Sequence, residues 1–245
     1  MLTGLLALIL LIFVASLMGV FVLLRKADAL YQALRPLMAF RRLHQGLALA
    51  MEEGRRLQYT IGRGPLTGAS STGSSLVALA ALDPIVRTAL RGDKPPAVTA
   101  GEPTVYVLAD NTTRVACREN RAEERCQPQP VRLVGMEEST YAAGAVVMAH
   151  GGQSALTLGL GHMGGEIVLA VDASERFVGG TDHLTGQAVL FATSDETLIG
   201  EEALAAGAYM RAHPMHAASL WVQDLLRWLL VFLLLAGGLV YSLIR

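Results

Sequence analysis

Three consecutive segments decide the fold: LQYTI at residues 57–61, STGSSLVALAALDPIVRTALR at 71–91 and AVTA at 97–100. The first and third are short, uncharged and largely apolar, as buried parallel strands are. The second has the length of a helix and is rich in alanine and leucine. A strand, a helix and a second strand in this order predict two parallel strands joined by a crossover helix.

The same alternation continues to about residue 210. Further strands are expected at 131–135, 155–160 and 176–179. Helices are expected at 104–121, 137–149 and 164–175, followed by a final helical region at 187–210. Pro103 supports the start of one helix, because proline is favoured in a first helical turn. The sequence therefore predicts an α/β domain with a doubly wound, Rossmann-like parallel sheet that helices cover on both faces.

Uncharged apolar runs lie near both ends of the chain, at residues 2–24 and 228–244. The first contains 23 residues, enough at about 1.5 Å per residue to span a hydrocarbon core roughly 30 Å thick. A signal peptide is the alternative for this run, but no basic segment precedes it and no clear A-x-A cleavage site follows it. Neither run contains an acidic or basic side chain, which disfavours a transporter or channel. The pattern predicts a two-pass membrane protein.

Basic residues close to the apolar runs predict the orientation. They lie between the two runs: Arg25, Lys26, Arg35, Arg41, Arg42, Arg211 and Arg227. Because such residues favour the cytoplasmic side, we expect a cytoplasmic central domain and outer termini, in a cell inner membrane or plasma membrane. In a reducing cytoplasm Cys117 and Cys126 are expected to be free thiols, whereas the opposite orientation would allow a disulfide.

These features divide the chain into five parts. They are a transmembrane helix at 1–24, a juxtamembrane helical neck at 25–55, a cytosolic α/β domain at 56–212, an interfacial connector at 213–227 and a second transmembrane helix at 228–245. The formal net charge is −1, and no basic patch carries interleaved aromatic residues. Nucleic acid is therefore not expected as a partner.

Small residues in the transmembrane segments allow close helix packing. They are Ala15, Gly19, Gly237 and Gly238. The neck adds an apolar stripe that can face the membrane, the domain or another copy of the chain. Beside the lipid membrane, the expected partner is a second copy or another membrane protein.

A first glycine-rich connection, residues 62–75, follows the strand at 57–61. Its candidate ligand-binding residues are Gly62, Gly64, Gly68, Ser70 and Ser71. Glycines permit close backbone approach, and the amide groups at the start of the next helix can bind an anion. The lysine of a P-loop is missing, so ordinary P-loop chemistry is not supported. The alternative is a tight turn with hydroxyl caps.

A second connection contains G-x-G-x-x-G at Gly159, Gly161 and Gly164. Asp182 follows 18 residues after Gly164, near the distance at which an acidic residue binds ribose in dinucleotide-binding folds. However, that fingerprint usually opens the first strand–helix unit, and this motif follows the fourth strand. The alternative is again structural: turns and close helix packing.

Catalytic and metal-binding signals are weak. Ser74 can be combined with His162 or His183 on paper, but no spacing fixes such a triad. His213, Met215 and His216 lie near Pro214 without a third strong metal ligand, so no metal site is expected. The sequence implies no particular cofactor, and it leaves open whether the protein is an enzyme.

Several short motifs are distinctive together: E-x-G-R-R-L at 52–57, a G-L-T-G-like turn at 64–68, KPPAVT at 94–99, STYAAGA at 139–145, and LIGEE with AGAY within 198–209. With them the chain resembles an uncharacterised prokaryotic two-pass membrane protein family classed as a domain of unknown function. The similarity covers roughly residues 50–210 and implies that 198–210 belongs to the domain. It implies no activity.

The sequence leaves two functional hypotheses. The first is a membrane-anchored cytosolic α/β module, a scaffold that binds a partner or assembles with itself at the inner membrane face. The alternative is a nucleotide-binding sensor or enzyme that uses the glycine-rich connections.

Overall fold

The computed structural model describes residues 2–24, 27–32, 34–68, 70–127, 129–151 and 154–244 of the 245-residue chain. Its contacts divide the chain into two compact units, Arg35–Ala212 and a second unit that joins Met1–Leu34 to His213–Arg245. Arg25 and Lys26, which contribute to the predicted orientation, lie outside the described residues. Met1 and Arg245, the outer ends of the expected transmembrane segments, also lie outside them.

The first unit contains a six-stranded sheet in the order β3-β2-β1-β4-β5-β6. The strands are β1 (Arg56–Gly62), β2 (Ala97–Ala100), β3 (Val131–Leu133), β4 (Ser154–His162), β5 (Phe177–Thr181) and β6 (Glu196–Leu198). Every pair of neighbouring strands is parallel. The predicted doubly wound α/β fold is therefore confirmed, and five of the strands lie where sequence patterns place them.

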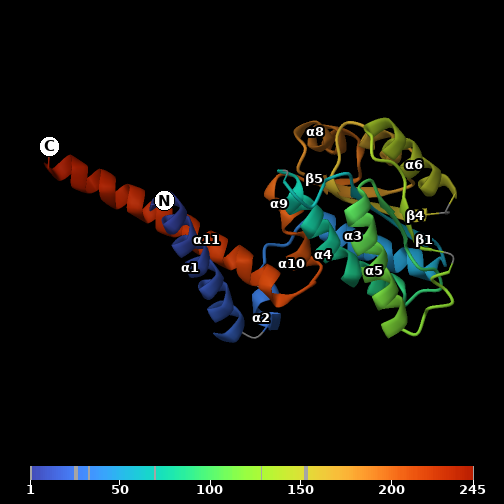
Figure 1. Cartoon of the computed structure of the whole chain (residues 1–245), viewed down its shortest axis with the longest axis horizontal. Helices are drawn as coiled ribbons and strands as arrows, with labels where there is room; N and C mark the ends of the chain where they lie inside the picture. The colour runs from blue at the N-terminus through green and yellow to red at the C-terminus, as the bar shows by residue number, and fades with distance from the viewer. Residues whose placement is uncertain are drawn as a thin grey trace. The chain divides into compact units, whose positions relative to one another are not determined.

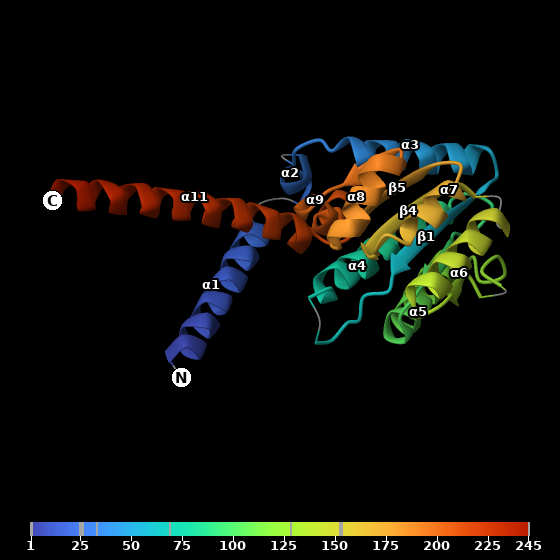
Figure 2. The same cartoon turned by 90° about the horizontal axis from the view of Figure 1, so that it is seen from above.

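Helices cover both faces of this sheet. One layer contains α3 (Met38–Glu52), α4 (Thr72–Ala89) and α5 (Pro103–Glu119), and the other contains α6 (Glu138–Gly151), α7 (Ile167–Asp172) and α8 (Leu184–Thr193). Figure 1 shows α6 and α8 on the opposite side of the sheet from α4 and α5. In Figure 2, α3 and α5 lie at opposite margins of the domain, and they contact β4–β6 and β2–β3 respectively.

Alternation along each strand gives the sheet two different faces. Leu57, Tyr59 and Ile61 of β1 join the larger hydrophobic core beneath α3, α4 and α5. Gln58 and Thr60 point the other way, where Gln58 donates a hydrogen bond to a carbonyl oxygen of α6. A smaller hydrophobic cluster lies on that second side: Tyr141, Ala145, Met163, Ile167, Ala170, Val171, Phe177 and Leu190.

The final region differs from the expectation of one helical segment at 187–210. It contains the end of α8, the edge strand β6, and the short helices α9 (Glu201–Leu204) and α10 (Ala206–Tyr209). The sequence Glu-Thr-Leu of β6 carries no apolar run. It forms a strand because it pairs with β5, Val178 opposite Glu196. A three-residue strand specified by a neighbour leaves no periodic signal in the sequence.

The second part of the expected neck packs on the sheet as α3. Its buried residues include Phe40, Leu43, Leu47 and Ala50. The apolar stripe predicted there therefore faces the domain core.

The expectation of free thiols is wrong in this structure, because Cys117 and Cys126 form a disulfide. The chain turns back after α5 and places the two Cα atoms 6.5 Å apart. Spacing alone does not reveal this turn, since the two cysteines are nine positions apart in the sequence.

The second unit contains α1 (Leu2–Leu24), α2 (Ala27–Gln32) and α11 (Pro214–Ile244). α1 and α11 contact each other, and both are long and apolar enough to cross a membrane, consistent with a two-pass protein. The expected connector and second span form one continuous helix that starts at Pro214. An added Cβ at Gly19, Gly237 or Gly238 meets nothing within 4 Å.

Candidate functional site

The candidate site lies at the carboxyl ends of β1, β4 and β5. The strand order reverses between β1 and β4, because β1 leads outward to β2 and β4 leads outward to β5. In open α/β sheets, ligands bind where the order reverses in this way. Both glycine-rich connections therefore begin side by side.

Two glycines are required by the approach of β1 to β4. A Cβ at Gly62 would lie 2.4 Å from the carbonyl oxygen of His162, and Gly62 has φ +84°. A Cβ at Gly161 would lie 1.9 Å from the carbonyl oxygen of Ile61, and its φ is +123°. These separations leave no room for a methyl group. Both glycines therefore have a structural role: they allow β1 and β4 to approach each other closely at their carboxyl ends.

The other residues of the first connection differ in exposure. A Cβ at Gly64 would lie 2.4 Å from Ser75 Oγ, whose hydroxyl donates a hydrogen bond to the Gly64 carbonyl oxygen. Ser71 is buried at the N-cap position of α4. Gly68, with φ +74°, and Ser70 lie at the exposed tip. Ala69 between them lies outside the described residues.

The second motif begins inside a strand. Gly159 and Gly161 both belong to β4, and only Gly164 lies in the turn before α7. A Cβ at Gly159 would lie 2.7 Å from Phe177 Cζ. In a dinucleotide fingerprint these glycines border the phosphates instead. Here, Gly159 makes room for an aromatic ring.

A chain of polar side chains connects three elements on the α4 side of the sheet. His162 Nδ1 lies 2.7 Å from Asp182 Oδ1, and Ser74 Oγ donates to Asp182 Oδ2 at 2.7 Å. The His183 ring packs edge-on against His162, with centroids 5.4 Å apart. The residues that sequence analysis named separately therefore do meet.

The hydrogen bonds do not join these side chains in the order serine, histidine, aspartate that a catalytic triad needs. Asp182 stands between Ser74 and His162, so the serine hydroxyl is not bonded to the imidazole. A nucleophilic serine needs the base within hydrogen-bond reach. What the geometry provides is an Asp–His pair in which the carboxylate orients the ring through Nδ1.

A second cluster on the α6 side contains residues that sequence analysis did not select. Arg63 follows β1, and its Nε lies 3.1 Å from Glu166 Oε1. Its Nη2 lies 3.0 Å from Glu138 Oε1. The Glu166 side chain is 6% exposed. Its Oε1 also accepts a hydrogen bond from the Gly164 amide. Its Oε2 has no hydrogen-bond partner in the described part of the chain. With Asp182, three carboxylates and one guanidinium lie at the strand ends where topology predicts a ligand crevice. This balance of charge is unfavourable for phosphate.

Buried hydroxyls on the α6 side connect β2, β1 and α6. Thr99 Oγ1 donates to Thr60 Oγ1 at 2.9 Å, Thr60 bonds the Tyr141 hydroxyl, and that hydroxyl accepts a bond from the Gly62 amide at 2.8 Å. Burial raises the pKa of Tyr141 to about 12. The phenol is therefore neutral at physiological pH and serves as a fixed bridge from α6 to β1.

A cleft of about 520 Å³ lies at the other end of the strands. It is bordered by α3 and by residues just before β5 and β6, among them Arg42, Gln45, Glu52, Arg176 and Asp195. Leu156 and Val178 form part of its lining. The cleft is thus separate from the crevice that topology predicts. Among the described residues, no group of three or more His, Cys, Asp or Glu side chains is arranged to hold a metal ion.

Comparison with known proteins identifies a family. The model of a domain of unknown function, DUF6754, matches residues 2–244, and the chain belongs to this family. The match extends across both apolar helices and the α/β domain, which confirms the family type suggested by the sequence motifs. No curated protein and no solved structure matches the chain.

Proposed function

We propose that this protein is a membrane-anchored assembly module whose α/β domain associates with a second copy through α6, α7 and α8. The observation that carries the proposal is an exposed apolar surface on these helices, termed the apolar face. It consists of Val147 (66% exposed), Val168 (38%), Leu169 (52%), Leu184 (81%) and Phe191 (73%). α7 contacts both α6 and α8, so these side chains belong to one helical layer.

Charge supports a second copy as the occupant. α8 contains no charged residue, and the acidic residues of α6 and α7, Glu138 and Asp172, lie at helix ends. A two-fold interface places the same surface on both subunits. Pairing through the apolar side chains of α8 therefore buries no charged residue of that helix, and it removes apolar surface from water on both subunits.

Membrane anchoring favours the same outcome. Helices α1 and α11, as membrane spans, restrict copies to two dimensions and raise their effective concentration. The basic residues beside the spans support a cytoplasmic position for the domain, in an inner or plasma membrane. Reporters fused at both termini test this orientation, since each is expected outside the cytoplasm.

The assembly is tested with the full chain in nanodiscs and in mild detergent. Light scattering is expected to give a dimer or larger species for the wild type, and mainly monomer for Phe191→Glu and Leu184→Glu. Val107→Glu on α5 is the matched control, because Val107 is also an exposed apolar residue, at 60%, but lies in the other layer. Monomeric wild type, or equal behaviour of the control and face variants, contradicts the proposal.

Lipid is the other occupant that the test must recognise. Brominated lipids quench a fluorophore placed at Phe191→Cys if this face enters the bilayer. Strong quenching without association would assign the apolar face to the membrane and reject the dimer.

A second candidate function is nucleotide binding at the crevice. The specific observation in its favour is the strand order, which places the connections after β1 and β4 at the reversal point. The excess of carboxylates weighs against it, because Glu138, Glu166 and Asp182 lie there with the single guanidinium of Arg63. A thermal shift of the solubilised chain with a nucleotide panel tests it, since a ligand that binds the native state raises the midpoint. No shift with any nucleotide rejects it.

A further inference from the structure

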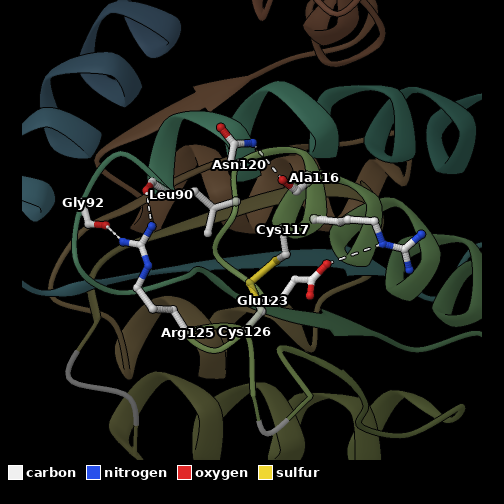
Figure 3. Close-up of a disulfide and its surroundings, with 9 residues drawn as sticks. Leu90, Gly92, Ala116, Cys117, Asn120, Glu123, Arg125 and Cys126 are labelled. Carbon is white, nitrogen blue, oxygen red and sulfur yellow. Dashed lines mark hydrogen bonds and ion pairs between the residues drawn. A yellow bond between two sulfur atoms is a disulfide. The ribbon is translucent and has the colours of Figure 1, made fainter.

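The disulfide lies at the connection between α5 and β3. Cys117, in the last turn of α5, is 2% exposed, and Cys126 is partly buried against the same core cluster. Figure 3 shows the disulfide closing the turn that contains Asn120 and Glu123. One sulfur is therefore enclosed by the core, and the other lies on a surface turn.

The cross-linked turn is also attached to α4. Arg125, next to Cys126, donates from Nη1 to the Gly92 carbonyl oxygen at 2.8 Å and from Nη2 to the Leu90 carbonyl oxygen at 3.3 Å. Asn120 Nδ2 donates to the Ala116 carbonyl oxygen at 2.8 Å. Figure 3 shows Arg125 reaching Leu90 and Gly92 on one side of the disulfide. The turn thus holds the ends of two helices together.

Backbone conformation shows that the turn is held in place by its surroundings. Arg121 has φ +54°, a left-handed conformation that residues with a side chain rarely adopt. Such conformations persist where neighbouring contacts determine them. In this turn those contacts are first the backbone bonds that end α5, from the Arg121 amide to the Arg118 carbonyl oxygen at 3.1 Å and from the Ala122 amide to the Cys117 carbonyl oxygen at 2.8 Å. The disulfide and the bonds of Arg125 add to them.

We propose that Cys117 and Cys126 are a reversible thiol pair whose oxidation locks the α5–β3 connection onto the end of α4. This inference rests on the proposed cytoplasmic orientation, because disulfides in that compartment are usually transient and responsive to redox state. In the reduced state the bonds of Arg125 and the packing of Ala122 still hold the turn beside the end of α4, but the turn opens more often because the cross-link to Cys117 is lost.

The chemistry is thiol–disulfide exchange with a low-molecular-weight disulfide, RSSR, such as a glutathione-type oxidant. The Cys126 thiolate attacks one sulfur, forms a mixed disulfide and releases one thiolate RS⁻. The Cys117 thiolate then attacks the Cys126 sulfur, forms the protein disulfide and expels the second RS⁻. Two electrons pass to RSSR, and the two cysteine protons end on two RSH molecules.

Thiol trapping in cells tests the redox state. Cells that express the full chain are quenched with acid, the precipitate is dissolved in denaturant, and free thiols are labelled with a polyethylene glycol maleimide that retards the protein on a gel. Two labels are expected before an oxidant is added, and none after brief exposure to a diazene thiol oxidant. Cys117→Ala and Cys126→Ala each mark the one-label position. A pair that stays oxidised in untreated cells, or reduced after exposure, overturns the proposal.

Protease accessibility of the domain distinguishes a wrong redox proposal from a wrong membrane orientation. An impermeant protease is added to intact cells. If the pair is always oxidised and the domain is digested from outside, the orientation is wrong and the disulfide is structural. If it is always oxidised but the domain is protected, the orientation stands and the redox proposal fails.

Limited trypsin digestion tests the lock itself. The purified full chain is equilibrated in reduced or oxidised glutathione, and cleavage after Arg121 and Arg125 is followed by mass spectrometry. Reduction is expected to accelerate these cuts at least about tenfold, because proteolysis follows the population of the opened turn. Cleavage after Arg41 in α3 is the internal control and is expected to be unchanged.

The Cys117→Ala/Cys126→Ala variant shows whether the disulfide itself, and not the redox buffer, changes the rate of cleavage. It is expected to be cut at the reduced rate in both buffers, with an unfolding midpoint roughly 5–10 °C below the oxidised wild type. Equal cleavage of oxidised wild type and this variant means that Arg125 holds the turn without the disulfide, and contradicts the lock.

Discussion

The two faces of the sheet differ in polarity, and the helical layers that cover them differ in charge. Toward α3, α4 and α5 the sheet presents leucine, isoleucine and valine, and the outer surface of α4 and α5 carries ion pairs beside exposed apolar residues such as Val107. Toward α6, α7 and α8 the sheet presents Gln58, Thr60, Thr99 and Thr157, and no charged residue of α8 accompanies its exposed Leu184 and Phe191. The second layer is therefore the better suited to contact another apolar surface.

Core substitutions on the two faces of β4 are the strongest way to test this difference. Leu158→Ala, on the α4 side, is expected to lower the free energy of unfolding by about 2–5 kcal/mol, because it removes buried apolar volume and leaves a cavity. Thr157→Val, its neighbour on the α6 side, is expected to cost no more than about 1 kcal/mol. Ser174, which donates to Thr157, also bonds the Ala170 carbonyl. Chemical denaturation measures both, and equal losses would contradict the contrast.

Two buried tyrosines offer a matched hydroxyl deletion. Tyr141→Phe leaves the Gly62 amide and the Thr60 hydroxyl without this partner, and an orphaned buried donor is costly, so a loss of about 2–3 kcal/mol is expected. Tyr59→Phe removes one bond to the Ala78 carbonyl oxygen, and a loss of about 1 kcal/mol is expected. The order of the two denaturation midpoints checks the prediction. The reverse order would show that polar bonds are less important beneath α6.

Alkaline unfolding gives the same comparison through pH. Burial raises the pKa of Tyr141 to about 12, above the ordinary value of about 10. A raised folded-state pKa gives stability that is complete below pH 10 and is lost as pH rises toward 12, by about 2–3 kcal/mol for this group. Burial also raises the pKa of Tyr59. Each Tyr→Phe variant is expected to flatten the decline between pH 10 and 12, which denaturation at several pH values measures; an unchanged decline would exclude both groups as its cause.

Sequence patterns specify much of this fold and little of the site. β1, β2, β4 and β5 are recognisable because each is a short run that the sheet buries. The edge strand β3 buries only Val131, and β6 depends on pairing with β5. Gly161 matches a ligand motif in sequence, but its φ and its proximity to Ile61 are properties of two strands that meet only in the folded chain.

The polar contacts of the crevice follow the same rule. Asp182 was selected by its distance from a glycine motif, yet its partners His162 and Ser74 come from β4 and α4. The pair of Arg63 and Glu166 joins positions 103 residues apart. Only the strand order brings these groups together, and no local period encodes that order. The sequence does contain one signal of this site: Arg63 directly follows β1, and Asp182 directly follows β5.

The smallest expected effect concerns the ion pairs of the first layer. Arg87 in α4 contacts Asp83 one turn before it and Glu119 in α5. These side chains are 38–53% exposed, so water and salt screen them, and Arg87→Ala is expected to cost about 0.5 kcal/mol or less. Repeating the denaturation in about 1 M salt, where screening acts within roughly 3 Å, is expected to remove most of the difference between variant and wild type. Thr193→Ala at the end of α8 is the control, since it has no charge to screen. A loss for Arg87→Ala that persists in high salt would mean that the alkyl part of the Arg87 side chain, and not its charge, stabilises this layer. The ion pairs on α4 and α5 would then contribute too little to distinguish this layer from α6–α8.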